Sequence, residues 1–270
     1  MAELPEITVL AGQISNELSG RKIEYADVKQ EKCLNIPVEQ FKKTIADKKI
    51  IRASNKGKWI FIRLSDGYNL LLNVGMGGDI LYYPPKSEWS SEYQIRFHFS
   101  DSSGFTCKFW WFGHVHLLNE KDEHKETAGI GISPLDKEFT KEYFYKLLGK
   151  NRAGIKSFIL NQKNIGGIGN MYIHDILFKA GIHPLKKADS LTNEQKDKLY
   201  YSITESMKKA YESNGFSYEK DFYGKNGGVS MDWFLVGYKE DQPCPVCGNK
   251  IEKIKTGGTS SFICANCQQI

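Results

Sequence analysis

The sequence predicts an α+β protein of several domains, and three observations support that prediction. An amphipathic helical pattern opens the chain, and short runs of β-branched and aromatic residues follow it within residues 1–125. Helical periodicity dominates the second half, and two close pairs of cysteines lie near the end. We therefore expect an N-terminal helix with an antiparallel β-sandwich or barrel, then a helical domain, and a C-terminal β-hairpin that carries the cysteines.

Composition sets limits on the class of protein. The chain has 270 residues, 40% hydrophobic and 13% aromatic, which is ample for buried cores. No apolar run reaches transmembrane length, and Glu3 and Glu6 stand where a secretory signal would carry positive charge. We therefore expect a cytosolic monomer that does not bind membranes and whose six cysteines do not form disulfides.

The N-terminal domain is expected to span residues 1–125. Its helix is indicated by apolar residues at helical spacing, with Pro5 near the start and Gly20 just past the end: Ile7, Leu10, Ile14 and Leu18. The β-branched and aromatic runs, bounded by turn sequences, predict strands within residues 58–64, 69–76, 92–100 and 104–112.

The second half divides into three expected parts. Residues 126–137 are polar and then rich in Gly and Pro, which is typical of a linker. Residues 138–239 form the helical domain, and its helices are expected within 138–150, 155–162, 171–181 and 191–214. The Gly-rich, aromatic residues 214–239 are expected to form a mobile loop that leads into a hairpin, and residues 240–270 to form the cysteine-bearing finger.

The strongest motif is a set of four cysteines spaced as C-x2-C-x16-C-x2-C: Cys244, Cys247, Cys264 and Cys267. Two thiolate pairs at this spacing predict one tetrahedral structural zinc ion. With four protein ligands no coordination position stays open, so the metal stabilises the fold and does not react. Cys33 and Cys107 are expected to be small buried hydrophobes, and His114 and His116, at strand spacing on one face, to be structural.

Two weaker features lie in the helical half. Between Asn151 and Ala188, six Lys or Arg residues stand against one acid, which suits either a solvated helical face or a polyanion such as nucleic acid. The turn at residues 165–170, I-G-G-I-G-N, precedes a predicted helix that Asn170 is placed to cap, and a helix N-terminus favours phosphate. Such a turn is more often ordinary turn chemistry, so these features alone leave the partner open.

Together, the acidic N-terminus, the G-I-G-N-x-Y helix start and the four-cysteine hairpin resemble the formamidopyrimidine-DNA glycosylase / endonuclease VIII family of base-excision repair enzymes. The resemblance covers essentially the whole chain through separated blocks: Met1-Ala2-Glu3-Leu4-Pro5-Glu6, Lys58, Gly75-Met76-Gly77-Gly78, Gly131-Ile132-Ser133-Pro134-Leu135, Lys156 and Asn161-Gln162 through Gly167-Ile168-Gly169-Asn170-Met171-Tyr172. It implies a β-sandwich with a catalytic N-terminal helix, a helix-two-turn-helix DNA-binding domain with a lesion loop, and a zinc finger.

The resemblance also implies the chemistry. After removal of Met1, the amine of Ala2 would attack C1′ of the sugar and form a Schiff base, with Glu3 as acid and base. An α-amine, with a pKa of roughly 7.7–8.0, loses its proton far more easily than lysine at about 10.4, and a nearby helix N-terminus disfavours its charged form further. Lys58 would hold a phosphate beside the lesion. Without the resemblance, Glu3 is simply a first-turn acid and Lys58 an edge-strand charge.

The remaining implied roles concern DNA. Lys156, Gly169 and Asn170 would contact the backbone, and Met76, Trp111 and Phe112 would fill the void left by the flipped base. Either damaged duplex or single-stranded DNA suits these residues, and the sequence does not name the lesion. The loop that reads the damaged base is expected within residues 216–230.

The chain departs from the family pattern at four places. Ala2 replaces proline, and Asp175 replaces a glutamate of the helix start. Thr259 replaces a finger arginine, which removes a bidentate phosphate contact. Trp110-Trp111 replace an arginine pair whose second member fills the hole in the duplex, so Trp111 is either an apolar wedge or a core residue; strand alternation would put the two rings on opposite faces.

Two hypotheses follow. The first is a DNA glycosylase and abasic-site lyase that acts on oxidised bases or abasic sites through the Ala2 amine. The second is a weakened relative that binds damaged DNA without excising bases.

Overall fold

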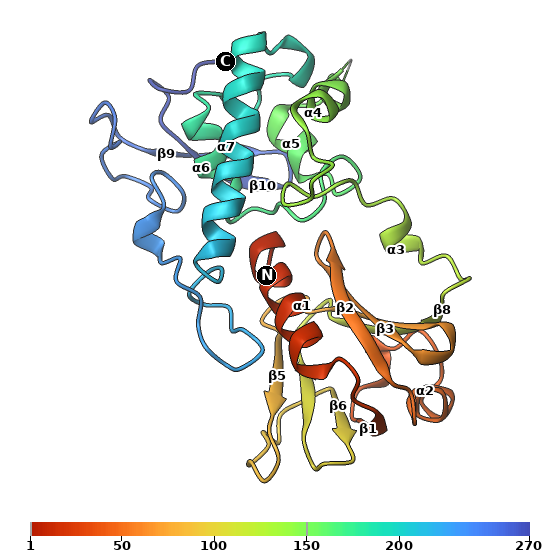
Figure 1. The fold of residues 1–270 in the computed structure, drawn as a ribbon. Coiled ribbons are helices and arrows are strands. Elements are labelled where there is room, and N and C mark those ends of the chain that lie inside the picture. Colours follow the sequence, from red (N-terminus) through yellow and green to blue (C-terminus); the bar gives the residue numbers. More distant parts are fainter. Residues whose placement is uncertain (1, 150) are drawn as a thin grey trace. The chain divides into compact units, whose positions relative to one another are not determined.

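The computed structural model describes residues 2–149 and 151–270, which form two compact units. The N-terminal unit combines residues 1–128 with residues 213–228, and the C-terminal unit combines residues 129–212 with residues 229–270. Each unit therefore draws on two separate stretches of chain (Figure 1). Among the described residues, none of the helices is both long enough and apolar enough to cross a bilayer.

Helix α1 (Leu4–Leu18) begins the N-terminal unit, as the sequence predicts. Pro5 lies in its first turn, where a missing N–H costs nothing, and the four predicted apolar positions are all buried. The helix packs on strands β2 and β3 of one sheet (Figure 1). Because the apolar stripe faces these strands, the first residues of the chain are fixed against the sandwich.

Two four-stranded antiparallel sheets form the body of this unit. One sheet has the order β1 (Ile23–Val28), β6 (Ile95–Phe99), β7 (Gly104–Lys108), β5 (Asp79–Tyr83). The other has the order β2 (Ile50–Lys56), β3 (Trp59–Leu64), β4 (Tyr68–Asn73), β8 (His114–Asn119). Helix α2 (Val38–Ile45) packs on β1, and short turns of helix lie at Glu31–Cys33, Ser65–Gly67 and α3 (Lys125–Ala128). The predicted sandwich is confirmed, and Cys33 and Cys107 are buried in its core.

One predicted strand is wrong at its end. Strand β7 ends at Lys108, so residues 109–112 do not continue the alternation that the sequence suggested. Trp110 and Trp111 are 69% and 63% exposed, and neither belongs to the core. The physical reason lies at Gly113, where a Cβ would meet the ring of Phe109 at 2.0 Å. The chain turns tightly around this buried ring and leaves the sheet.

His114 and His116 lie on one face of β8, as predicted. The ring of Trp59 stacks on His114 at 5.7 Å and lies 5.7 Å from His116. His116 Nδ1 lies 2.9 Å from His124 Nε2, and burial lowers the pKa of His116 to about 4. A neutral, buried imidazole that is hydrogen-bonded to a second one is a structural group.

The C-terminal unit contains four α-helices in its described part: α4 (Lys141–Leu148), α5 (Ile155–Leu160), α6 (Ile173–Lys179) and α7 (Asn193–Glu212). Lys150, the last residue of the first expected helix, lies outside the described residues. Short 3-10 turns occur at Ala188–Ser190 and Met231–Trp233, and the hairpin of β9 (Glu252–Thr256) and β10 (Thr259–Ile263) follows. The buried carboxylate of Asp175 accepts backbone N–H bonds from Leu235, Val236 and Gly237 at 2.6, 3.1 and 2.9 Å, which fixes the chain before the finger to α6.

Residues 213–228 differ from the expected mobile loop. Gln13 of α1 donates to Asp221 Oδ2 at 3.0 Å and accepts from the N–H of Phe222 at 2.8 Å. The N–H of Tyr82 donates to the carbonyl of Phe222 at 2.8 Å, and the Phe222 ring is fully buried in the sandwich core. This segment, which we call the docked segment, is therefore packed against α1 and β5, although the helical domain precedes it in sequence.

Candidate active site and metal centre

The candidate residues divide between the two units. Those at the N-terminus and on the sandwich belong to the N-terminal unit: Ala2, Glu3, Lys58, Met76, Trp111 and Phe112. Those of the helical domain belong to the C-terminal unit: Lys156, Gly169 and Asn170. Met1, whose removal the Ala2 chemistry requires, lies outside the described residues.

Ala2 and Glu3 stand directly before α1 and are buried, at 3% and 4% exposure. Glu3 occupies the N-cap position, and its N–H donates to Glu6 Oε2 at 2.8 Å. The other oxygen of Glu6 accepts the N–H of Phe216 at 2.8 Å. One buried carboxylate thus joins the start of the chain to the docked segment, at the positive end of the helix dipole.

Gly215 makes this arrangement possible. Its φ is +80°, and a Cβ at this position would meet Glu6 Cγ at 2.6 Å. Only glycine accepts both the left-handed backbone and the approach of the Glu6 side chain. In the sequence, Glu6 shows only capping-box spacing, three residues after Glu3, and no pattern there predicts its contact with Phe216.

Lys58 lies in the turn between β2 and β3 and not within a strand, which corrects the expectation of an edge-strand lysine. Asn73 Nδ2 donates to the carbonyl of Lys58 at 3.3 Å, and Asn73 Oδ1 accepts the N–H of Gly75 at 2.9 Å. A single amide side chain therefore connects the Lys58 turn to the turn that carries Met76.

The turn that carries Met76 pairs through its backbone with the two exposed tryptophans. The N–H of Met76 donates to the carbonyl of Trp111 at 2.9 Å, and the N–H of Trp110 donates to the carbonyl of Met76 at 3.1 Å. Gly75 is required here, because a Cβ would meet the Trp111 carbonyl at 2.1 Å. Met76, Trp110, Trp111 and Phe112 are all exposed and form what we call the aromatic surface. The open question between a wedge and a core residue is thus settled against the core.

Glu219 in the docked segment is a further ionisable group near the N-terminus of α1. Burial raises the pKa of its carboxyl group, and the negative charge of Glu6 acts in the same direction. No local sequence pattern distinguishes Glu219 from a surface acid, so only the structure points to it.

Lys156 is almost fully buried in the C-terminal unit, at 2% exposure. Its ammonium group, with three N–H donors, lies within hydrogen-bonding distance of four neutral oxygens of the finger hairpin: Thr256 Oγ1 at 3.3 Å, Thr259 Oγ1 at 3.0 Å, Ser260 O at 2.5 Å and Ser261 Oγ at 2.9 Å. None of these partners carries a negative charge, and burial lowers the pKa of Lys156 to about 8. Thr259, the residue at the position of the absent arginine, is thus one of its acceptors.

Asn170 does not cap α6, which corrects the sequence-based expectation. The helix begins at Ile173 with Tyr172 in the cap position, and no side chain caps it. Gln162 shapes the preceding turn instead, since it accepts the N–H of Gly167 and donates to the carbonyl of Ile168, both at 2.8 Å. Asn170 Oδ1 is buried and has no hydrogen-bond donor within the described part of the chain. Gly169 directly precedes it in the same turn.

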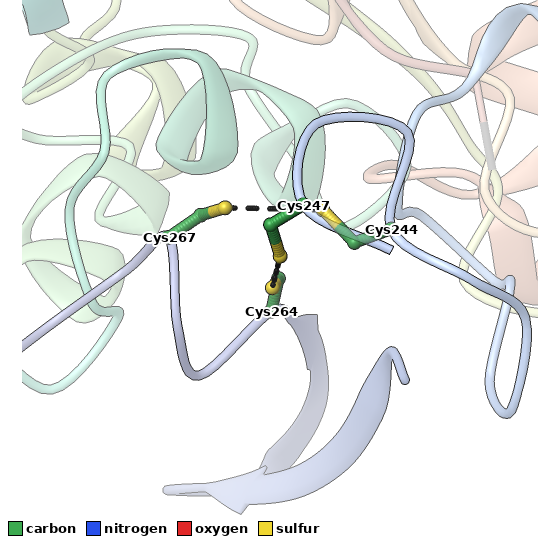
Figure 2. Close-up of side chains that lie close together, drawn as sticks. All are labelled: Cys244, Cys247, Cys264 and Cys267. Carbon is green, nitrogen blue, oxygen red and sulfur yellow. Dashed lines mark hydrogen bonds between the residues drawn. The ribbon is translucent and has the colours of Figure 1, made fainter. Parts of the chain in front are cut away.

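The four cysteines converge as the spacing predicts (Figure 2). Their sulfurs all lie within 4.8 Å of one another, with Cys244 and Cys267 3.9 Å apart and Cys247 and Cys264 3.4 Å apart. Tetrahedral zinc with Zn–S bonds of about 2.3 Å needs sulfur separations of roughly 3.8 Å, so the donor set fits one zinc ion. All four positions are taken by protein, and the zinc is structural.

Three family models match the chain in the order of its expected parts. The formamidopyrimidine-DNA glycosylase N-terminal domain matches residues 1–109, and the H2TH domain of formamidopyrimidine-DNA glycosylase matches residues 130–221. The zinc finger found in FPG and IleRS matches residues 241–270.

Relatives and solved structures agree with these models. The formamidopyrimidine-DNA glycosylase of Pelotomaculum thermopropionicum is 33% identical and that of Chloroflexus aurantiacus 32%, with 100% and 99% of this chain and 100% and 98% of the relatives covered. The Fpg of Lactococcus lactis in complex with DNA containing N7-benzyl-Fapy-dG superposes with a TM-score of 0.90 at 26% identity, covering 99% of this chain and 100% of that one. Its complex with abasic-site DNA gives a TM-score of 0.88 at 26% identity, with 100% of both chains covered.

Proposed function

This chain belongs to the formamidopyrimidine-DNA glycosylase family, and on that premise we propose that it is a DNA glycosylase with abasic-site lyase activity. Its substrates are oxidised bases or abasic sites in DNA. The observation that carries the proposal is the buried Ala2–Glu3 pair at the head of α1, held in place through Glu6.

The proposed reaction starts from the neutral α-amine of Ala2, which exists once Met1 is removed. Its lone pair attacks C1′ of the extruded nucleotide, and the electrons of the glycosidic bond leave with the base. The Glu3 carboxylate takes a proton from the attacking Ala2 nitrogen and passes it to the sugar ring oxygen, which opens the ring and leaves a Schiff base between Ala2 and C1′. The departing base takes its proton from water. Elimination of the flanking phosphates follows, with Glu3 carrying protons.

The location of the pair favours these roles. The positive end of α1 disfavours an ammonium group at Ala2 and favours a carboxylate at Glu3. Because the N–H of Glu3 is bonded to Glu6, the Glu3 backbone is already ordered before the substrate binds, and binding does not have to supply the free energy of ordering it.

The DNA contacts follow from charge and exposure. Lys58, in its turn beside the aromatic surface, holds a phosphate near the lesion, while Met76, Trp111 and Phe112 occupy the void in the duplex. In the C-terminal unit Gly169 and Asn170 contact further phosphates, and Lys156 acts on a phosphate through the charge that it places behind the finger hairpin. The buried positive charge of Lys156 has only neutral partners in the finger, so a phosphate that approaches the hairpin supplies its counter-charge.

Trapping with borohydride tests the enzyme directly. Zinc-loaded protein mixed with abasic-site DNA and borohydride should give a covalent adduct, and acetylation of the N-terminus should abolish it. Intact mass measured beforehand reports whether Met1 is absent. Failure of the processed, folded protein to form any adduct would refute the lyase proposal.

The alternative is a damaged-DNA-binding protein that does not excise bases. It is favoured by the replacement of proline with Ala2, whose methyl group packs in the sandwich core, and by the exposed aromatic surface. Such a protein binds abasic-site duplex more tightly than undamaged duplex and yields no adduct. A panel of oligonucleotides with different lesions, in duplex and single-stranded form, identifies the preferred substrate in either case.

A further inference from the structure

An aromatic ladder crosses the outer face of the sheet that contains β1, β6, β7 and β5. Tyr25 of β1 stacks on His98 of β6 at 4.2 Å, His98 stacks on Trp89 at 4.9 Å, and Trp89 stacks on Tyr83 of β5 at 5.0 Å. The ring planes differ by only 11°, 9° and 14°. On β7, Gly104 leaves the space for Trp89, since a Cβ there would meet the indole at 2.3 Å. Strands β1, β6 and β5 thus each contribute one ring to the ladder, and β7 contributes the glycine on which the Trp89 ring lies.

A β-bulge completes one end of this ladder. The pairing of β1 with β6 shifts register between Ile23 and Tyr25, and as a result Glu24 and Tyr25 are both exposed. In a regular strand successive side chains point to opposite faces of the sheet, so without the bulge one of these two side chains would point into the core. The bulge therefore places a carboxylate beside the outermost ring of the ladder, which is 46% exposed.

A cavity of about 350 Å³ lies at this end, and its walls include Glu24, Tyr25, Trp89, Arg96 and His98. His98 is oriented by a 3.0 Å contact between its Nε2 and Asp27 Oδ2. The volume suits one planar ligand of nucleobase size.

Arg96 lines the cavity at its Trp89 end. Its guanidinium group lies over the rings of Trp89 at 5.0 Å and Tyr93 at 4.1 Å, and Nη2 donates to the carbonyl of Ser90 at 2.8 Å. Nε is buried and has no acceptor among the described residues, where Arg96 also makes no ion pair. The guanidinium is thus held flat against Trp89 and Tyr93 and closes this end of the cavity.

We propose that this cavity is a second nucleobase-binding site of the N-terminal unit, separate from the Ala2–Glu3 site, and that it selects guanine. The base stacks on the exposed end of the ladder at Tyr25. Its N1–H and N2–H₂ groups donate to the Glu24 carboxylate. Adenine presents an acceptor at N1 and a donor at N6, which reverses this pattern and repels the carboxylate. The base comes either from a free nucleotide or from an unpaired position in single-stranded DNA.

The test is a comparison of two nucleotides on the full-length, zinc-loaded protein by isothermal titration calorimetry. Guanosine monophosphate should bind at least about tenfold more tightly than adenosine monophosphate, as expected for one bidentate base contact. Glu24→Gln should abolish this preference, and Tyr25→Ala should weaken both ligands. Glu39→Gln, at an exposed acid of α2, serves as the matched control and should change nothing.

Two oligonucleotides distinguish the sources of the base. A dT heptamer with one central dG is compared with dT7 on the wild type and on Glu24→Gln. A dG preference that disappears in Glu24→Gln supports the site even when the free nucleotide does not bind, and identifies DNA as the source. Equal affinity for guanine and adenine ligands, or a guanine preference that persists in Glu24→Gln, overturns the proposal. Absence of binding by both nucleotide and oligonucleotide at millimolar ligand overturns it as well. None of these readouts depends on adduct formation, so the outcome is independent of the proposed catalysis.

Discussion

Replacing Glu6 by glutamine tests whether this carboxylate organises the start of the chain. Its two oxygens accept one backbone N–H each, from Glu3 and from Phe216, both at 2.8 Å. Glutamine has nearly the same shape but only one acceptor oxygen. Its NH₂ group would therefore face one of the two N–H donors in a buried position.

The expected loss follows from these two bonds. One hydrogen bond to a charged acceptor contributes about 1.5–3 kcal/mol, and a buried N–H without an acceptor costs about 1–3 kcal/mol. We expect Glu6→Gln to lower the free energy of unfolding by about 3 kcal/mol. For a chain of this size, that corresponds to a fall in Tm of roughly 6–12 °C.

Chemical denaturation of the zinc-loaded protein, followed by circular dichroism, measures this change. Glu39→Gln replaces an acid whose side chain is 90% exposed and should stay within about 0.5 kcal/mol of the wild type. A Glu6→Gln protein as stable as this control would refute the assigned role of Glu6. The borohydride adduct should also form more slowly in Glu6→Gln, because the Glu3 backbone is no longer fixed.

Three further predictions concern charge, stacking and the nucleophile. Burial lowers the pKa of Lys156 from 10.5 to about 8, so the unfolded chain binds more protons than the folded one between these values and stability should rise with pH across that window. Urea midpoints at pH 7 and pH 9.5 should show this rise in the wild type and not in Lys156→Met. Trp111→Ala should weaken binding to damaged duplex by about tenfold, with a smaller effect on undamaged duplex and none on the unfolding midpoint, since the ring is exposed; equal losses on both duplexes in a binding titration would contradict the wedge. Ala2→Pro should accelerate phosphate elimination relative to base release, because a proline iminium cannot lose its charge as the imine of a primary amine can; product gels that show an unchanged ratio would contradict this.

Local patterns were sufficient for the elements whose signal lies in neighbouring residues. Helix α1 follows from its apolar stripe and Pro5, and the zinc ligands follow from two close cysteine pairs. Strands β2 and β5 carry mixed polar and apolar residues, because only part of each strand is buried, and they gave no comparable signal. The tryptophan pair was misplaced for a related reason: its apolar character suggested a continuing strand, whereas Gly113 and the buried Phe109 ring end it.

Contacts between distant residues set the rest of the candidate site. Glu6 and Phe216 are 210 residues apart, and Lys156 and Ser261 are 105 apart. No periodicity or spacing reports such pairs. The sequence therefore predicted Lys156 as a charged residue of the helical domain but not its enclosure by the finger hairpin. It predicted a loop at residues 214–239 but not that residues 213–228 belong to the N-terminal unit.

The docked segment has a consequence for biosynthesis. Phe216 and Phe222 hold α1 in place, and they lie in the last quarter of the 270-residue sequence. They are therefore translated long after α1 itself. At about 5–20 residues per second, roughly 10–40 s separate the synthesis of Glu6 from that of its partner. During that time Glu6 lacks the backbone N–H of Phe216 that it accepts in the folded protein. The carboxylate that organises the start of the chain therefore stays without its second partner until most of the sequence has been made.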